Sequence, residues 1–339
     1  MSTAYHQIVP IRRGHIGRVG VVAASSSEVD LAGGHCHQPF RVSYSGRMAP
    51  ESFVRPALPS DRETIAEFTT DTFDWGDYVT DVFDEWLERE DTFVAVAESD
   101  DGRPVALGAV RMLSPTEAWY SAARVHPDFR GRGIAAHVSG ALRTWAREQG
   151  AVVGRLLVED WNEVAIRHVE KTGSRRVASV VRCTKPVGDA SPSPDGNGGR
   201  RLPSKLRARP AGSTEAQPAY ASWSVGELGR ASRGLIGVGW AFRRLTPTDL
   251  EEAARAGAFW EIGAGWALAA PTLGARFEVA WLETREEDAN DLLRSLIDLA
   301  IGSGAESISI WVPAIEWMIQ AARRRGFETS LMHVYAREI

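Results

Sequence analysis

The sequence predicts an α/β (α+β) protein of two tandem domains, and three features of the chain support this fold class. Segments with the periodicity of strands and helices alternate between residues 51 and 185. Residues 186–218 are dominated by Pro, Gly, Ser and Arg, a composition typical of a linker. A second series of alternating elements then runs from 219 to 339. We therefore expect two folded domains joined by this linker.

The elements of the first domain follow from local patterns. A strand is expected at 53–57, and Ser60 or Asp61 caps the helix after it. Apolar residues keep helical spacing from Trp75 to Arg89. The turn Asp100-Asp101-Gly102 joins two further strands into a hairpin. The remaining periodic segments predict strands at 92–98, 105–113, 117–125, 152–158 and 176–184 and helices at 134–149 and 162–172.

Residues 1–50 lack such periodicity and predict a disordered or poorly structured leader. Met48 stands just before the first structured stretch, which suggests an alternative translation start. Whether residues 1–47 belong to the native protein is therefore open. We expect their deletion to leave the stability of the fold unchanged.

Composition excludes several classes of protein. The net charge of −5 argues against a nucleic-acid-binding protein, which would be basic. Only two cysteines occur, Cys36 and Cys183, and no apolar run is long enough to span a membrane. Residues 35–37 do not predict a metal site, because adjacent side chains cannot close a tetrahedron without a second pair of ligands. These features, with no signal peptide at the N-terminus, predict a cytoplasmic protein.

The stretch from Val125 to Ala135 carries the strongest chemical signal. A strand leads into it and an amphipathic helix leads out. The first amides of a helix have no internal partner and face the positive end of the helix dipole, so they bind anions. Gly131 and Gly133 let the backbone approach a phosphate without a Cβ in the way. Arg130 and Arg132 add permanent positive charge, so the stretch predicts a polyphosphate site.

The spacing of the glycines and arginines in this loop narrows the choice of phosphate-containing ligand. No Gly-Lys-Ser/Thr follows, as a Walker loop requires, and the Gly-x-Gly-x-x-Gly spacing of a Rossmann turn fails. Read as Arg-x-x-Gly-x-Ala, residues 130–135 resemble the acetyl-CoA signature of the GNAT superfamily of N-acetyltransferases. The resemblance covers about residues 53–185. It implies a mixed, mostly antiparallel sheet flanked by helices, with acetyl-CoA as the acetyl donor and a primary amine as the acceptor.

The resemblance also implies roles for individual residues. The backbone around Val125 would pair with the pantetheine arm of the cofactor, and Asn162 would also contact the cofactor. The pyrophosphate would be held by the backbone amides of residues 130–135, which are Arg130, Gly131, Arg132, Gly133, Ile134 and Ala135. Glu117, near the start of its strand, is the first candidate for the general base, with Glu159 and Asp160 as alternatives.

The general acid is less clear, because Val169 stands where many relatives have a catalytic tyrosine. Either His168 or Tyr120 replaces it, or CoA leaves as a thiolate that water protonates, or activity is weak. A non-catalytic acyl-CoA-binding or protein-interaction module is the alternative function.

The second domain repeats part of the first. Gly304-Ala305 echoes Gly150-Ala151, with a strand and a helix after each, so residues 219–339 are predicted to be a second, degenerate GNAT-like domain. Its loop reads Thr284-Arg285-Glu286-Glu287-Asp288, and carboxylates at a helix N-terminus repel a pyrophosphate. We therefore expect no CoA there, and a role in packing, in shaping the acceptor cleft or in dimerisation.

The acceptor is indicated only by charge. Between Asp61 and Asp91 there are twelve acidic residues and two basic ones. Such a field favours a cationic amine, carried by a small molecule or a peptide, although a solvated outer helix face explains the same pattern. We expect that face of the helix to hold Asp77, Asp81, Asp84 and Glu88. The sequence does not identify the acceptor. It also leaves the oligomeric state open, and a homodimer is one of the possible states.

Overall fold

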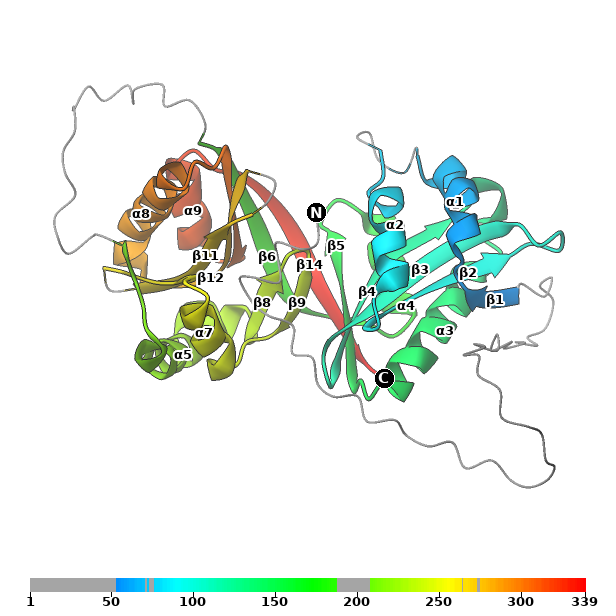
Figure 1. Cartoon of the computed structure of the whole chain (residues 1–339), viewed down its shortest axis with the longest axis horizontal. Helices are drawn as coiled ribbons and strands as arrows, with labels where there is room; N and C mark the ends of the chain where they lie inside the picture. The colour runs from blue at the N-terminus through cyan, green and yellow to red at the C-terminus, as the bar shows by residue number, and fades with distance from the viewer. Residues whose placement is uncertain (1–52, 71, 73–75, 188–207, 264, 273–274) are drawn as a thin grey trace, which may run out of the picture. The chain divides into compact units, whose positions relative to one another are not determined.

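The computed structural model describes residues 53–339 except 71, 73–75, 188–207, 264 and 273–274 (Figure 1). The expected leader, with Met48 and residues 35–37, and most of the expected linker lie outside the described residues. The described chain divides into two compact units. The first holds residues up to Gly154 together with Ile339, and the second runs from Arg155 to Glu338.

The first unit is an antiparallel sheet with helices on both faces. Strands β1 (Phe53–Pro56), β2 (Thr92–Glu98), β3 (Pro104–Ser114) and β4 (Glu117–Val125) pair in that order. Successive residues of a strand face opposite sides. Accordingly, Val94 and Val96 pack with helices α1 (Arg62–Thr69) and α2 (Val79–Glu88), whereas Ala95 and Ala97 pack with α3 (Ile134–Glu148). This double coverage explains why β2 and β3 are apolar almost throughout.

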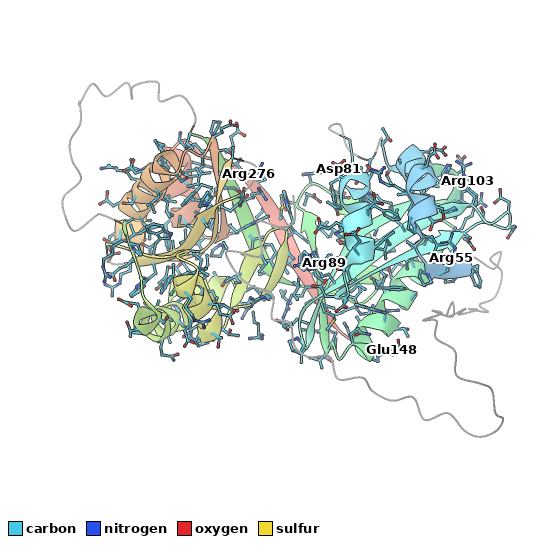
Figure 2. All side chains as sticks on the ribbon, in the orientation of Figure 1. Arg55, Asp81, Arg89, Arg103, Glu148 and Arg276 are labelled. Carbon is cyan, nitrogen blue, oxygen red and sulfur yellow. The ribbon has the colours of Figure 1, made fainter. Side chains whose placement is uncertain are left out.

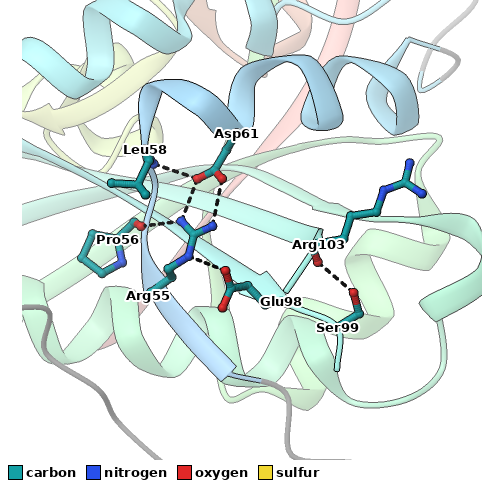
Figure 3. Close-up of polar contacts among 7 residues, drawn as sticks. All are labelled: Arg55, Pro56, Leu58, Asp61, Glu98, Ser99 and Arg103. Atoms are coloured by element: carbon teal, nitrogen blue, oxygen red, sulfur yellow. Dashed lines mark hydrogen bonds and ion pairs between the residues drawn. The ribbon is translucent and has the colours of Figure 1, made fainter. Parts of the chain in front are cut away.

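An arginine fixes the start of α1 to the sheet (Figure 3). Arg55 of β1 donates to both carboxylate oxygens of Asp61, at 2.7 and 2.8 Å, and to Glu98 of β2 at 2.6 Å. Asp61 also accepts from the backbone N–H of Leu58 at 2.7 Å. The chain before α1 is therefore held to two strands by one largely buried guanidinium.

Helix α2 begins later than its apolar spacing predicted. The sequence suggested a start at Trp75, which lies outside the described residues, whereas α2 starts at Val79. Gly76 has a left-handed φ of 96°, and the Asp77 carboxylate accepts from the N–H of Val79 at 3.0 Å. The left-handed turn and this cap delay the helix by one turn.

Most strands of the second unit also pair in one continuous order. In the order of the sheet its strands are β5 (Val153–Glu159), β14 (Glu328–Glu338), β6 (Arg175–Pro186), β13 (Ser307–Pro313), β12 (Arg276–Glu283), β11 (Gly265–Pro271), β10 (Phe259–Ile262) and β7 (Ala208–Pro210). Strands β12 and β13 are parallel. The helices are α4 (Glu163–Lys171), α5 (Ala216–Val225), α6 (Glu227–Ala231), α7 (Pro247–Arg255), α8 (Ala289–Gly302) and α9 (Glu316–Arg324). A separate hairpin joins β8 (Leu235–Val238) and β9 (Ala241–Arg244).

The closing strands of the two halves are exchanged. Strand β6 ends the first half of the sequence, but it lies between β14 and β13, which belong to the second half. Strand β14 in turn lies between β5 and β6. This exchange explains why the boundary between compact units falls at residue 154 instead of within the predicted linker. Strand β7 and the start of α5 also lie inside the range expected for that linker, 186–218.

Candidate active site

The loop between β4 and α3 requires glycine because of its backbone conformation. Gly131 and Gly133 have φ values of 77° and 80°. Other residues enter this left-handed region at a cost of about 1–2 kcal/mol. A Cβ at either position would have no heavy atom within 4 Å, so the surroundings are open. The loop therefore presents bare backbone at both glycines, and both are also needed for the turn itself.

The start of α3 suits an anion. Gly133 is the N-cap, so no side chain caps the first amides of the helix. The first turn contains no acidic residue. The Ile134 side chain is buried and fixes this end of the helix against the core. The N–H groups of Ile134 and Ala135 therefore meet the requirements of a phosphate site at a helix N-terminus.

The two loop arginines are exposed and bonded to the loop backbone. Arg130 donates from Nε to the carbonyl of Val125 at 3.2 Å. Arg132 donates to the carbonyl of Asp128 at 2.8 Å, and its guanidinium lies 4.8 Å from the centre of the Phe129 ring. These bonds hold both positive charges beside the glycines. The Val125 carbonyl, expected to face pantetheine, already accepts from Arg130, so the arm would displace this bond or use a neighbouring group.

Strand β4 is interrupted by a bulge just before the loop. Leu107 of β3 pairs with Arg124 and Ala109 pairs with Ser121, so two residues of β4 lie opposite Gly108. One of them, Ala122, has a φ of 56°. A bulge leaves backbone groups outside the regular ladder and is common beside active sites. The sequence pattern of β4 did not predict it.

A buried ion pair ties the segment before α2 to β4. Arg124 donates from Nε to Asp77 at 2.6 Å, and the Asp77 side chain is 1% exposed. This corrects the expectation that Asp77 lies on a solvated helix face. Arg124 directly follows the bulge, so the pair fixes the segment before α2 at this point of β4.

The candidate base lies at the far end of β4. Glu117 is buried, and Ser114 donates to one of its carboxylate oxygens at 3.4 Å. Val125 lies eight positions further along the strand, which corresponds to roughly 25 Å. An acyl group near Glu117 would therefore require a ligand that extends from the loop along most of β4.

The candidates for the general acid have different surroundings. Tyr120 packs in the core of the first unit, where a Cβ on Gly154 would lie 2.2 Å from its ring. His168 is exposed on α4, in the second unit. Beside it, Val169 is buried and packs against Val158 and Tyr335. Val169, at the position of the expected tyrosine, is therefore part of the core.

Asn162 acts as the N-cap of α4. Its side-chain oxygen accepts from the N–H of Ala165 at 3.1 Å. This local role accounts for an asparagine at the start of the helix. Its amide NH₂ group remains the part of the side chain suited to the cofactor contact that the sequence suggested.

The corresponding loop of the second half is different. A short 3₁₀ turn, Glu286–Asp288, precedes α8 and places three carboxylates at its N-terminus. Strands β12 and β13 pair only from Arg276 to Val279. Beyond that point, the β8–β9 hairpin packs against both strands. A Cβ on Gly237 would lie 2.7 Å from Trp311, whose ring centre is 5.1 Å from that of Phe242. The hairpin was not predicted from the sequence.

The acidic segment 61–91 is less negative than its sequence suggests. Six of its described carboxylates pair with arginines: Asp61, Glu67, Asp77, Asp84, Glu85 and Asp91. Four of the partners, Arg55, Arg103, Arg111 and Arg124, come from outside the segment. The exposed carboxylates of the described segment that form no such pair with an arginine are Glu63, Asp81, Glu88 and Glu90, and Figure 2 labels Asp81 on α2. Among the described residues of the segment, these four carboxylates are the ones best placed to attract a cation.

The described residues contain neither a cluster of metal ligands nor a helix suited to span a membrane. No group of three or more His, Cys, Asp or Glu side chains there is arranged to hold a metal ion. No helix there has the length and apolar character needed to cross a membrane.

Part of the chain matches a known protein family. Residues 62–173 match the acetyltransferase (GNAT) family. No curated protein matches the chain. The structure is similar to that of a GCN5-related N-acetyltransferase from Sphaerobacter thermophilus, with a TM-score of 0.60 and 16% identity over 85% of this chain and 95% of that one.

A tandem GNAT protein from the clavulanic acid biosynthesis pathway, solved without AcCoA, is also similar. Its TM-score is 0.52 at 14% identity, over 84% of this chain and 98% of that one. At such identities the likeness shows the fold, and it extends over both halves of the chain. Residues 62–173 thus match the acetyltransferase (GNAT) family, and the chain shares its fold with GNAT proteins.

Proposed function

We propose that this acyltransferase moves an acetyl group from acetyl-CoA to a primary amine. The observation that carries the proposal is the loop at 130–135. Its two left-handed glycines lead into a helix whose first turn has neither a side-chain cap nor an acidic residue, and two arginines lie beside it. These features match the diphosphate of CoA in charge and in hydrogen-bond donors.

In this proposal, acetyl-CoA supplies the activated thioester and the protein handles the protons. Glu117 takes a proton from the ammonium form of the acceptor, directly or through water, so that the amine can attack. Backbone groups at the bulge of β4 are suited to polarise the carbonyl oxygen. Tyr120 or His168 then protonates the departing thiolate, unless water does so. Asn162 contacts the cofactor through its amide nitrogen.

We further propose that the second half does not bind CoA. Two observations support this. Glu286, Glu287 and Asp288 occupy the start of α8. The β8–β9 hairpin packs against the diverging ends of β12 and β13, the counterparts of the strands that would hold pantetheine in the first half.

A calorimetric titration with acetyl-CoA tests both proposals. We expect one site per chain, lost in Gly133→Glu. The matched control is Gly102→Glu, because Gly102 has the same φ of 80° and equally open surroundings but lies in a hairpin turn. If both variants bind normally, the loop is not the site. Two sites per chain would overturn the proposal for the second half.

The non-catalytic alternative is favoured by one observation. Val169 fills the position of the expected tyrosine with a buried apolar side chain. Glu117→Gln separates the two functions. An enzyme should lose turnover with a panel of amines and keep its affinity for acetyl-CoA. A wild-type protein that binds acetyl-CoA without acetylating any amine would support the binding module.

We also propose that the acceptor amine is cationic, on the basis of the exposed carboxylates at positions 63, 81, 88 and 90. Replacing Asp81 and Glu88 by Asn and Gln should raise KM for a polyamine, and added salt should have the same effect. A preference for neutral amines would contradict this proposal.

A further inference from the structure

Three polar side chains from distant parts of the sequence meet in the second unit. Ser179 of β6 and His333 of β14 are cross-strand neighbours. Asp160 follows β5, and its backbone N–H donates to the carbonyl of Leu331 at 3.2 Å. The cluster exists only because β14 lies between β5 and β6, so it is a product of the strand exchange.

The three side chains form a continuous chain of hydrogen bonds. His333 Nε2 lies 2.8 Å from Asp160 Oδ1, and His333 Nδ1 lies 3.0 Å from Ser179 Oγ. The imidazole is 5% exposed, whereas the Asp160 side chain is 56% exposed and Ser179 is partly exposed. A buried ring therefore connects a carboxylate and a hydroxyl that solvent reaches.

The chemistry of the partners fixes the direction of these bonds. An ionised carboxylate only accepts, so Asp160 holds the proton of the neutral ring on Nε2. Nδ1 then carries the lone pair and accepts the hydroxyl proton of Ser179. A hydroxyl beside a base, which is itself oriented by a third group, is the arrangement of an activated nucleophile.

Exposed apolar side chains lie near Asp160 and His333 along the chain. Trp161 directly follows Asp160 and is 69% exposed, and Val164 is 73% exposed. Leu331, whose carbonyl accepts from Asp160, is also exposed. Large apolar side chains that remain in solvent offer a surface for the acyl or aryl part of a ligand.

We propose that Ser179 is a nucleophile that accepts acyl groups from small esters or thioesters. Ser179 Oγ bonds to the acyl carbon, the bond from that carbon to the leaving oxygen or sulfur breaks, and the hydroxyl proton passes through His333 Nδ1 to the leaving group. Water then attacks the acyl-serine, gives a proton to His333 and releases the acid, and the proton returns to Ser179. Asp160 positions the ring. The site shares no residue with the loop at 130–135 and goes beyond the proposed amine acetylation.

Labelling of the wild-type chain gives the first test. A fluorophosphonate probe and p-nitrophenyl acetate should both modify Ser179, located by mass spectrometry of its peptide. Ser224 is the internal control, because it is exposed and its hydroxyl only donates to the carbonyl of Ala221. Labelling of Ser179 no faster than Ser224 overturns the proposal, and this comparison requires no variant.

Variants then assign the roles. His333→Gln should slow ester hydrolysis by roughly a hundredfold or more, since a general base contributes about that factor. Asp160→Asn should also slow it, because asparagine can stabilise the wrong tautomer. Glu163→Gln is the matched control, an exposed α4 carboxylate paired with Arg167, and should leave the rate unchanged. Equal rates in folded His333→Gln and wild type would overturn the proposal. Neither readout uses CoA, so the amine acetyltransferase proposal can fail independently.

Discussion

Gly108 of β3 lies directly against Leu142 of α3. A Cβ at position 108 would be 3.0 Å from Leu142 Cδ1 and 3.1 Å from Val138 Cγ1. A side chain at position 108 would therefore require Leu142 and Val138 of α3 to shift by a few tenths of an ångström. Because the loop at 130–135 leads directly into α3, the same contact sets how closely the start of this helix approaches β4.

Gly108→Ala should therefore destabilise the protein, by about 1–3 kcal/mol, because the added methyl group forces the helix or its side chains to move. Urea unfolding measures the change. Gly302→Ala is the control: Gly302 ends α8, and a Cβ there has no heavy atom within 4 Å. That variant should be neutral or more stable by up to about 1 kcal/mol. Equal effects of the two variants would contradict this account.

The sequence predicted what depends on local patterns. The strand at 117–125 and the start of α3 at Ile134 are confirmed, because alternation, helical spacing and glycine turns act over a few residues. The exchange of β6 and β14 could not be predicted, because edge pairing between strands 150 residues apart leaves no local signal. For the same reason, the sequence did not predict the hydrogen bond between His333 and Asp160, which depends on the position of β14 beside β5.

The acidic segment 61–91 shows a different limit of prediction from sequence, which concerns surface charge. The count of charges along the sequence predicts a strongly negative surface. In the structure, however, Arg55, Arg103 and Arg124 from other elements form ion pairs with carboxylates of this segment. Asp77 was expected to be solvated and is buried in such a pair. Net charge in a segment therefore overestimates the field at its surface whenever partners come from distant strands.

Glu283, at the end of β12, should make stability depend on pH. It is buried; one carboxylate oxygen accepts from Ser222 at 2.9 Å, and the other has no hydrogen-bond partner among the described residues. Burial raises the pKa of Glu283 above its ordinary value of 4.5. Because the pKa is raised in the folded state, the contribution of the protonated Glu283 to the free energy of unfolding is fully present below about pH 4.5. This contribution is lost as the pH rises through the folded-state pKa.

Glu283→Gln should consequently be more stable than wild type at pH 7, because glutamine can still accept from Ser222 without a buried charge. The advantage should shrink as the pH falls towards 4. Urea unfolding between pH 4 and 8 measures it. Glu306→Gln, at an exposed position, should show no such pH-dependent difference. A Glu283→Gln variant that is less stable than wild type at pH 7 would show that the charge is well solvated.

The strand exchange predicts that neither half folds alone. A fragment of residues 51–187 would lack β14, which separates β5 from β6, and a fragment of residues 208–339 would lack β6, which separates β14 from β13. Each would expose unpaired strand edges. We expect no cooperative thermal unfolding from either fragment, and recovery of a cooperative transition when equimolar fragments are refolded together. A fragment 51–187 that unfolds cooperatively by itself would argue against the exchange.

The ion pair between Asp77 and Arg124 should contribute more to stability than its exposed neighbour. Removal of Asp77 leaves a mostly buried guanidinium, since the Arg124 side chain is 16% exposed, and also removes the acceptor for the N–H of Val79. Asp77→Ala should cost about 2–4 kcal/mol. Asp84→Ala breaks a pair with Arg62 in which both side chains are at least half exposed, and it should cost less than about 1 kcal/mol. Urea unfolding of both variants gives the comparison.

Because Arg124 follows the bulge of β4, we also expect Asp77→Ala to lower kcat/KM for the amine while acetyl-CoA affinity stays unchanged. Loss of acetyl-CoA affinity instead would show that the pair supports the loop rather than the segment before α2.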